Sequence, residues 1–156
     1  MRFALAALAV LLLAACSPEG AGPEPAEAPE PAAVLAGVDL GQPMRALGTE
    51  PFWAVELTGN EMVYSGVDRP EQRAPQPKID IQGTTATFDS VTSAGTPLSV
   101  MLAATECSDG MSDRTYPLSA IVRIGDETLT GCAASVAAIM TTGESGPVVE
   151  KAQPAP

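Results

Sequence analysis

Apolar and polar residues alternate with a period of two in several short segments of the chain, a pattern typical of β-strands that bury one face. Turn residues separate these segments, and the connections are shorter than the dozen or so residues that a parallel crossover needs. The sequence therefore predicts an all-β fold, a small antiparallel barrel or sandwich of about seven to eight short strands. The strand-like segments are residues 52–57, 61–66, 78–82, 84–91, 98–102, 116–124 and 128–133.

The first of these segments illustrates the pattern. In FWAVEL, Trp53, Val55 and Leu57 fall on one face of the predicted strand, and the turn residues that follow favour a hairpin with residues 61–66. Residues 133–140 are ambiguous, because their alanines favour a helix whereas their β-branched residues permit a strand.

The chain begins with a different pattern. After Met1 and Arg2, residues 3–15 (FALAALAVLLLAA) are apolar without a break. Thirteen residues at about 1.5 Å of helical rise each cannot cross a hydrocarbon core of about 30 Å. The segment fits the apolar region of a secretory signal, so we predict that residues 1–15 are a signal peptide.

The end of this apolar run, Leu13-Ala14-Ala15-Cys16, resembles the lipobox of bacterial lipoproteins. The resemblance implies cleavage before Cys16, a diacylglyceryl thioether on its sulfur, and membrane lipid as a partner. Stable anchoring needs at least two acyl chains, which agrees with such a modification. The alternative is ordinary cleavage that leaves Cys16 as a free or paired thiol. By analogy with the family, Ser17 favours an outer-membrane lipoprotein that faces the periplasm.

Proline and glutamate dominate residues 16–37, and no apolar periodicity is present there. Such a segment is expected to be a disordered linker, because prolines favour extended chain and the glutamates repel one another. Residues 143–156 have a similar composition and are expected to form a flexible tail. The predicted β-domain then spans residues 38–142.

Cys107 and Cys132 are the only cysteines in this domain. Export to an oxidising compartment favours a disulfide between them. Two thiols without histidine do not complete a usual zinc site, and a redox pair would more often be spaced as CxxC.

A loop rich in Ser, Asp and Gly follows the first of these cysteines, and we expect two successive turns there. The same residues could instead form a recognition loop, a Ca²⁺ site built on Asp109 and Asp113, or a catalytic centre. The Ca²⁺ ligand ladder is absent, and nothing in the sequence would activate a serine nucleophile. The candidate recognition loop comprises Ser108, Asp109, Gly110, Met111, Ser112 and Asp113.

Trp53 is the sole tryptophan, and we expect it in the core with its indole N–H bonded to a backbone carbonyl. The alternative is a binding groove flanked by Phe52 and Trp53 with Glu50 at its rim.

Three strings in the domain resemble a family of small, uncharacterised bacterial envelope lipoproteins. They are GTEPFW (residues 48–53), CSDGMSD with the following Tyr-Pro (residues 107–117) and LTGCA (residues 129–133). The resemblance supports export and the disulfide and implies no activity or ligand.

Charge and composition exclude several kinds of catalytic site and of binding partner. The chain has 19 Asp and Glu against 8 Lys and Arg, a net charge of −11, and no histidine. The missing histidine excludes a Ser-His-Asp triad and a Cys-His pair. The negative charge argues against nucleic acid, whose phosphates are neutralised by Lys and Arg. We expect no catalytic residue, metal or cofactor.

The preferred hypothesis is a monomeric, lipid-anchored, non-catalytic module for binding or envelope protection. One alternative is an inhibitor of a basic periplasmic or secreted protein such as lysozyme, because an acidic surface attracts a basic partner. Another is an acidic-loop cation-binding protein or hydrolase that uses Asp109 and Asp113. A third is a structural component of an outer-membrane assembly.

Overall fold

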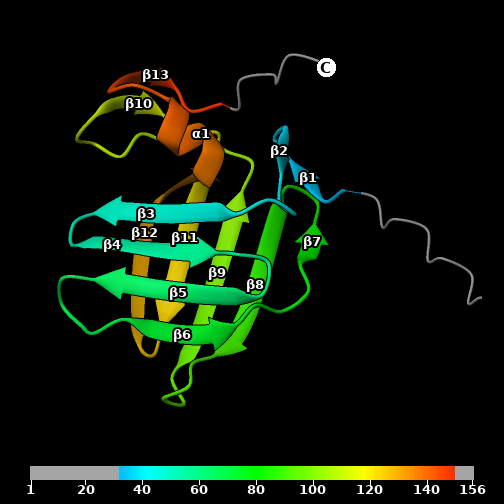
Figure 1. The fold of residues 1–156 in the computed structure, drawn as a ribbon, viewed down its shortest axis with the longest axis vertical. Helices are drawn as coiled ribbons and strands as arrows, with labels where there is room; N and C mark the ends of the chain where they lie inside the picture. The colour runs from blue at the N-terminus through cyan, green and yellow to red at the C-terminus, as the bar shows by residue number, and fades with distance from the viewer. Residues whose placement is uncertain (1–31, 150–156) are drawn as a thin grey trace, which may run out of the picture. The chain divides into compact units, whose positions relative to one another are not determined.

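A computed structural model describes residues 32–149. Nine strands form one antiparallel sheet, shown in Figure 1. The nine are β3 (Met44–Thr49), β4 (Phe52–Leu57), β5 (Glu61–Gly66), β6 (Gln72–Pro75), β7 (Asp80–Gln82), β8 (Thr85–Val91), β9 (Pro97–Ala103), β11 (Leu118–Ile124) and β12 (Glu127–Ser135). Their order in the sheet is β6-β5-β4-β3-β12-β11-β9-β8-β7.

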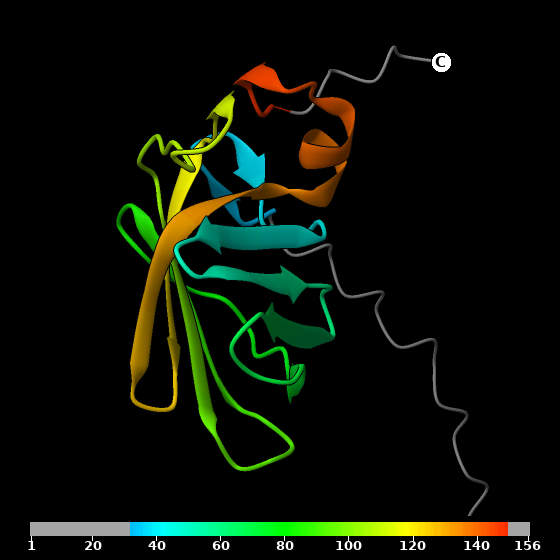
Figure 2. The ribbon, with the colours of Figure 1, turned by 90° about the vertical axis from the view of Figure 1, so that its left-hand side faces the viewer.

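The sheet curls into a half-barrel. Strands β3 to β6 cross in front of β8, β9, β11 and β12 (Figure 1), and the long strand β12 bends between the two layers (Figure 2). At the opposite corner, the N–H of Ser93 donates to the carbonyl of Arg73 at 2.9 Å, and the Ser90 hydroxyl donates to the carbonyl of Pro75 at 2.7 Å. These bonds join the end of β8 to β6.

The predicted fold class is confirmed: the domain is all-β, its main sheet is antiparallel, and Cys107 and Cys132 form a disulfide. The predicted faces are also correct, because Trp53, Val55 and Leu57 all point into the core. The largest fully buried side chains include Tyr64, Phe88, Leu40, Met44, Met62, Leu98, Leu102, Leu118 and Ile124.

Ordered structure extends past both predicted domain boundaries. β1 (Val34–Leu35), which lies in the stretch expected to be linker, pairs with β2 (Val38–Asp39) at the start of the predicted domain. β13 (Ser145–Pro147), in the expected tail, pairs in parallel with β10 (Asp113–Thr115). Burial explains both extensions, because Leu35 is 5% exposed and Val148 is fully buried. The predicted signal peptide, Cys16, and the rest of the linker and tail lie outside the described residues.

The ambiguous segment contains a strand end and a short helix. β12 continues to Ser135, and α1 (Val136–Thr141) follows at once. The Ser135 hydroxyl caps α1 by accepting a hydrogen bond of 3.1 Å from the N–H of Ala138. A second, smaller core forms here from Tyr116, Cys132, Ala134, Ala138 and Val148.

Candidate functional site

The three strings that the sequence singled out come together around one pocket of about 480 Å³. Its walls are the end of β3 with the turn at Glu50, the loop from Cys107 to Met111, and Thr130 and Gly131 of β12. We call this the loop pocket. The candidate recognition loop and one member of the candidate groove, Glu50, therefore belong to the same site.

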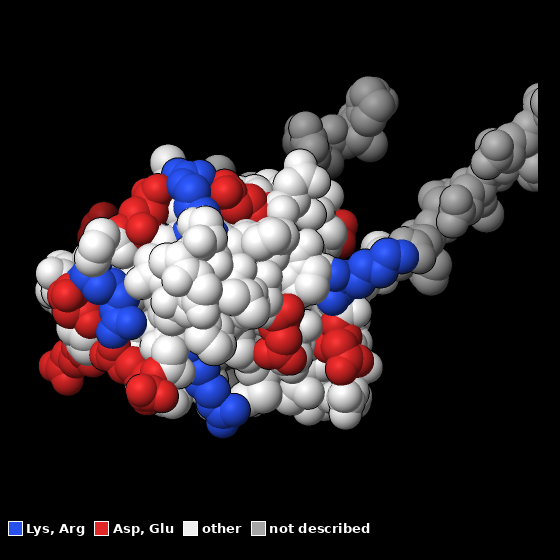
Figure 3. Space-filling view, turned by 90° about the horizontal axis from the view of Figure 1, so that it is seen from below, with Lys and Arg blue, Asp and Glu red and all other residues white. Residues whose placement is uncertain are grey.

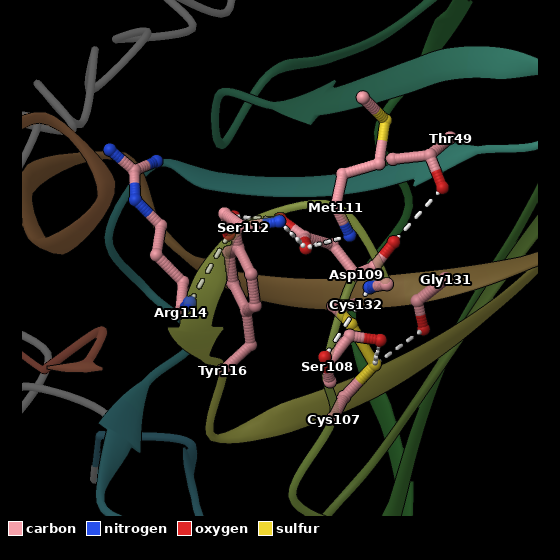
Figure 4. Close-up of a disulfide and its surroundings, with 11 residues drawn as sticks. Thr49, Cys107, Ser108, Asp109, Met111, Ser112, Arg114, Tyr116, Gly131 and Cys132 are labelled. Atoms are coloured by element: carbon pink, nitrogen blue, oxygen red, sulfur yellow. Dashed lines mark hydrogen bonds between the residues drawn. A yellow bond between two sulfur atoms is a disulfide. The ribbon is translucent and has the colours of Figure 1, made fainter. Parts of the chain in front are cut away.

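A hydrogen bond holds two of these walls together. The Thr49 hydroxyl donates to the backbone carbonyl of Asp109 at 2.9 Å (Figure 4). Thr49 ends β3, and the chain reverses at the cis Glu50–Pro51 peptide bond to begin β4 at Phe52. The turn thus lies next to a loop that is 60 residues away in the sequence.

Asp109 organises the loop itself. One of its carboxylate oxygens accepts hydrogen bonds from the N–H groups of Met111 at 3.0 Å and Ser112 at 2.8 Å. The other accepts from the hydroxyls of Ser112 at 2.7 Å and Tyr116 at 3.3 Å. Gly110 has a φ of 74°, which only glycine adopts without strain. The expected pair of Asp- and Ser-based turns is confirmed (Figure 4).

The same contacts set the protonation of Asp109. Its partial burial acts to raise the pKa of the carboxyl, but the hydrogen bonds from Ser112, Met111 and Tyr116 stabilise the charged form and hold the pKa below its usual value. Burial, together with the nearby charge of Asp109, raises the pKa of the Tyr116 phenol. Asp109 is therefore an ionised acceptor and Tyr116 a neutral donor at neutral pH.

The disulfide forms the base of the loop. Cys107 and Cys132 have Cα atoms 5.5 Å apart and close a loop across 25 positions. Cys107 also pairs with Tyr116 through two backbone hydrogen bonds of 2.8 and 2.9 Å. The loop is thus fixed at its start by a covalent bond to β12, and Tyr116 leads directly into β11.

Trp53 packs under the glycines of the loop pocket. It is 4% exposed, and a Cβ at Gly48 would lie 2.6 Å from its Cε2 atom. A Cβ at Gly131 would lie 2.9 Å from the ring atom Cζ2 and nearer still to the carbonyl of Leu47. The expected core position is confirmed. The expected hydrogen bond is wrong, because among the described residues Trp53 Nε1 has no partner: the ring lies against glycine backbone instead of turning its N–H to a carbonyl.

The candidate groove residues line two adjoining pockets. Glu50 lines the loop pocket, whereas Phe52, which is 52% exposed, and Trp53 both line a neighbouring pocket of about 420 Å³ together with Val67. This pocket shares Gly48 and Thr49 with the loop pocket. Met111, which lines the loop pocket, is 68% exposed. The site thus offers exposed apolar side chains beside a polar cavity.

The carboxylates do not gather into a ligand set. Asp109 is occupied by four donors of its own loop, and Asp113 begins β10, where it pairs with Ser145. Across residues 32–149, no three His, Cys, Asp or Glu side chains come together in a way that could hold a metal ion. The geometry therefore gives no support to the cation-site or hydrolase hypothesis for Asp109 and Asp113.

Strand β12 pairs with β3 along only part of its length. β3 pairs with β12 from Ser135 to Cys132 and no further, whereas β11 follows β12 down to Glu127. Successive residues of a strand direct their backbone groups to alternate sides, and the N–H of Val136 bonds on the β3 side. Thr130 and Thr128 therefore point their N–H groups to the side that β3 has left, and neither pairs with a strand there.

Sequence reasoning missed Arg114. Its guanidinium donates to the carbonyls of Gly143 at 2.7 Å and Thr142 at 3.2 Å, just after α1. Basic side chains commonly bond the last carbonyls of a helix. No pattern in the sequence indicates this contact, because the partners lie almost thirty residues downstream.

Comparison with protein-family models, curated proteins and solved structures yields no match. In the described part of the chain, no helix has the length and apolar character needed to span a membrane.

Proposed function

We propose that the protein is a lipid-anchored envelope lipoprotein that faces the periplasm, and that its β-domain is a non-catalytic binding module. The observation that carries the binding role is the meeting of three separate chain segments around the loop pocket. The disulfide and the Thr49–Asp109 hydrogen bond hold those segments together. A preorganised pocket of this kind lowers the entropic cost of binding.

The anchor is supported by sequence alone. The apolar run to Ala15, the lipobox-like end at Cys16 and the Pro/Glu-rich spacer are the order expected of a domain tethered to a membrane. The chain between Cys16 and β1, about 17 residues at about 3.1 Å each, would let the domain reach up to about 50 Å from the lipid surface.

Charge favours a basic protein as the partner. Residues 32–149 carry fourteen Asp and Glu against six Lys and Arg, a net charge of −8. Acidic and basic groups are interspersed on the face seen in Figure 3. The loop pocket, in contrast, is lined by Glu50 and Asp109 with no Lys or Arg. Met111 and Phe52 supply apolar contacts beside this negative cavity.

The test is a titration of the full chain, kept soluble in detergent, with lysozyme as a basic protein and α-lactalbumin as an acidic protein of similar size. Calorimetry at low salt should detect binding of lysozyme only, and the binding should weaken strongly at high salt. Glu50→Gln should reduce the affinity, with Glu71→Gln, which lies outside the loop pocket, as the matched control. Equal affinity for both proteins, or no binding to either, would contradict the proposed partner class.

An inhibitor of such a basic enzyme is the second candidate, and the acidic pocket lining favours it. Hydrolysis of bacterial cell walls by lysozyme should then fall when the full chain is added in micromolar excess at low salt. Binding without any loss of lysozyme activity would support the binding-module hypothesis and rule out the inhibitor hypothesis.

A further inference from the structure

We propose that the partner binds as an extended basic segment that adds a strand to the free edge of β12 and places one side chain in the loop pocket. The proposal rests on the proposed binding function and specifies its mode and the chemistry of the ligand. Adding a strand to a sheet edge supplies affinity through backbone hydrogen bonds and specificity through pockets for alternate side chains.

The backbone geometry provides the edge. From Gly131 to Glu127, β12 is paired only with β11. Thr130 and Thr128, both exposed, direct their N–H groups to the side on which β3 no longer pairs with β12. Exposed edges of this kind pair readily with another chain unless they are blocked by proline, lysine or a bulge. The register of β11 and β12 is continuous along this stretch, and no proline or lysine lies in it.

The loop pocket lies at the end of this edge. Thr130 and Gly131 belong both to β12 and to the pocket lining. A strand that pairs with Thr128 and Thr130 would run directly into the cavity beside Glu50.

Charge complementarity selects a basic segment. Glu50 lines the pocket, and Glu106 and Asp113 flank its loop; within the described range none of the three forms an ion pair. A second copy of the chain is the less favoured occupant, because two domains that each carry a charge of −8 repel one another.

The experiment uses a peptide of about eight residues that alternates Lys and Val, with an alternating Glu and Val peptide as the charge control. Because Trp53 is the sole tryptophan and packs under Gly131, its emission can follow the titration. Amide hydrogen exchange of the full chain then tests whether the peptide binds as an added strand. The backbone amides of Thr128 and Thr130 should exchange fast in the free protein and become protected when the Lys peptide is bound.

Two modifications separate strand addition from simple charge attraction. A Lys and Val peptide that is N-methylated on alternate residues keeps its charge but lacks the N–H groups that face β12, and should bind at least about tenfold more weakly. Thr130→Pro should have a similar effect, because it removes an outward N–H without breaking the ladder with β11. Thr130→Val keeps that N–H and should therefore bind more tightly than Thr130→Pro.

The outcomes are distinct. Binding of the Lys peptide with no protection of Thr128 and Thr130, and equal binding of the methylated peptide, would overturn strand addition and leave the binding module intact. Protection of both amides in the free chain that grows with its concentration would assign the edge to a second copy and also overturn the proposal. If neither the peptide nor lysozyme binds, the proposed binding function itself is contradicted. The exchange measurement needs no variant, so misfolding of Thr130→Pro does not affect it.

Discussion

The indole of Trp53 lies directly against Gly131, so closely that a Cβ at position 131 would come within 2.9 Å of the ring atom Cζ2. The same Cβ would also meet the carbonyl of Leu47 on β3. Gly131 therefore permits two contacts at once: the approach of β12 to β3, and the packing of the sole tryptophan beneath the loop pocket.

We predict that Gly131→Ala lowers the free energy of unfolding by about 1–3 kcal/mol, because the added methyl must displace either the ring or the β3 backbone. Urea unfolding followed by Trp53 emission measures the change. The matched control is Gly143→Ala, since a Cβ there meets nothing within 4 Å and the φ is not positive; it should change stability by less than about 0.5 kcal/mol. Equal effects of both variants would contradict the packing argument.

The Asp109 carboxylate should make the stability of the loop depend on pH. Its pKa is lowered in the folded state, so its contribution is fully present above the pKa of an unfolded aspartate, about 3.9, and is lost as the pH falls through the folded value. Asp109→Asn should therefore lower the Tm at pH 7, and the difference from the parent should shrink below about pH 4. Thermal unfolding between pH 7 and 2.5 measures this, with Asp89→Asn as a control outside the loop. A difference that stays constant at every pH would contradict the role of the charge.

The disulfide should contribute about 3–4 kcal/mol to stability through the loop that it closes, by the chain-entropy estimate. The measurement compares urea unfolding of Cys16→Ala with that of the same variant carrying Cys107→Ser and Cys132→Ser. In the single variant Cys107→Ser, the buried Cys132 thiol should react with a thiol reagent only after unfolding. An unchanged unfolding midpoint in the double serine variant would contradict the stabilising role.

The proposed anchor predicts that Cys16→Ala moves the protein from the membrane fraction to the soluble periplasmic fraction. The reason is that no thiol remains to carry the acyl chains, and a domain released from lipid is not retained. Fractionation of cells followed by immunoblotting measures the distribution, and Ser17→Ala should leave the membrane association unchanged. A Cys16→Ala protein that stays with the membrane would rule out lipidation as the anchor.

The sequence predicted most of the strands that carry the core, because burial of one face imposes a period of two. Trp53, Val55 and Leu57 are an example, and all three are buried. Six strands were missed: β3, whose inward-facing positions Met44, Ala46 and Gly48 include a small residue and a glycine, then β6, and the short strands β1, β2, β10 and β13. Two or three residues are too few to show a period, and their burial depends on contacts with distant segments, as that of Val148 shows.

The candidate site was predicted only in parts. The cysteine count predicted the disulfide, and the Ser, Asp and Gly composition predicted the turns that Asp109 caps. The meeting of Thr49 with Asp109 could not be predicted, because it depends on how β3 and β12 cross in space. The unpaired edge at Thr128 and Thr130 could not be predicted either, because it exists only where β3 stops pairing with β12 at Gly131.

A small cavity beside α1 shows where the two ends of the described chain lie. It is lined by Ala36 and Val38 from the start of the described chain and by Val148 and Val149 from its end. The polypeptide thus enters and leaves the half-barrel at neighbouring points. A short peptide bridge between these points would allow circular permutation, with new termini opened at an exposed hairpin such as the one at Gly83, while every strand pairing of the main sheet is retained.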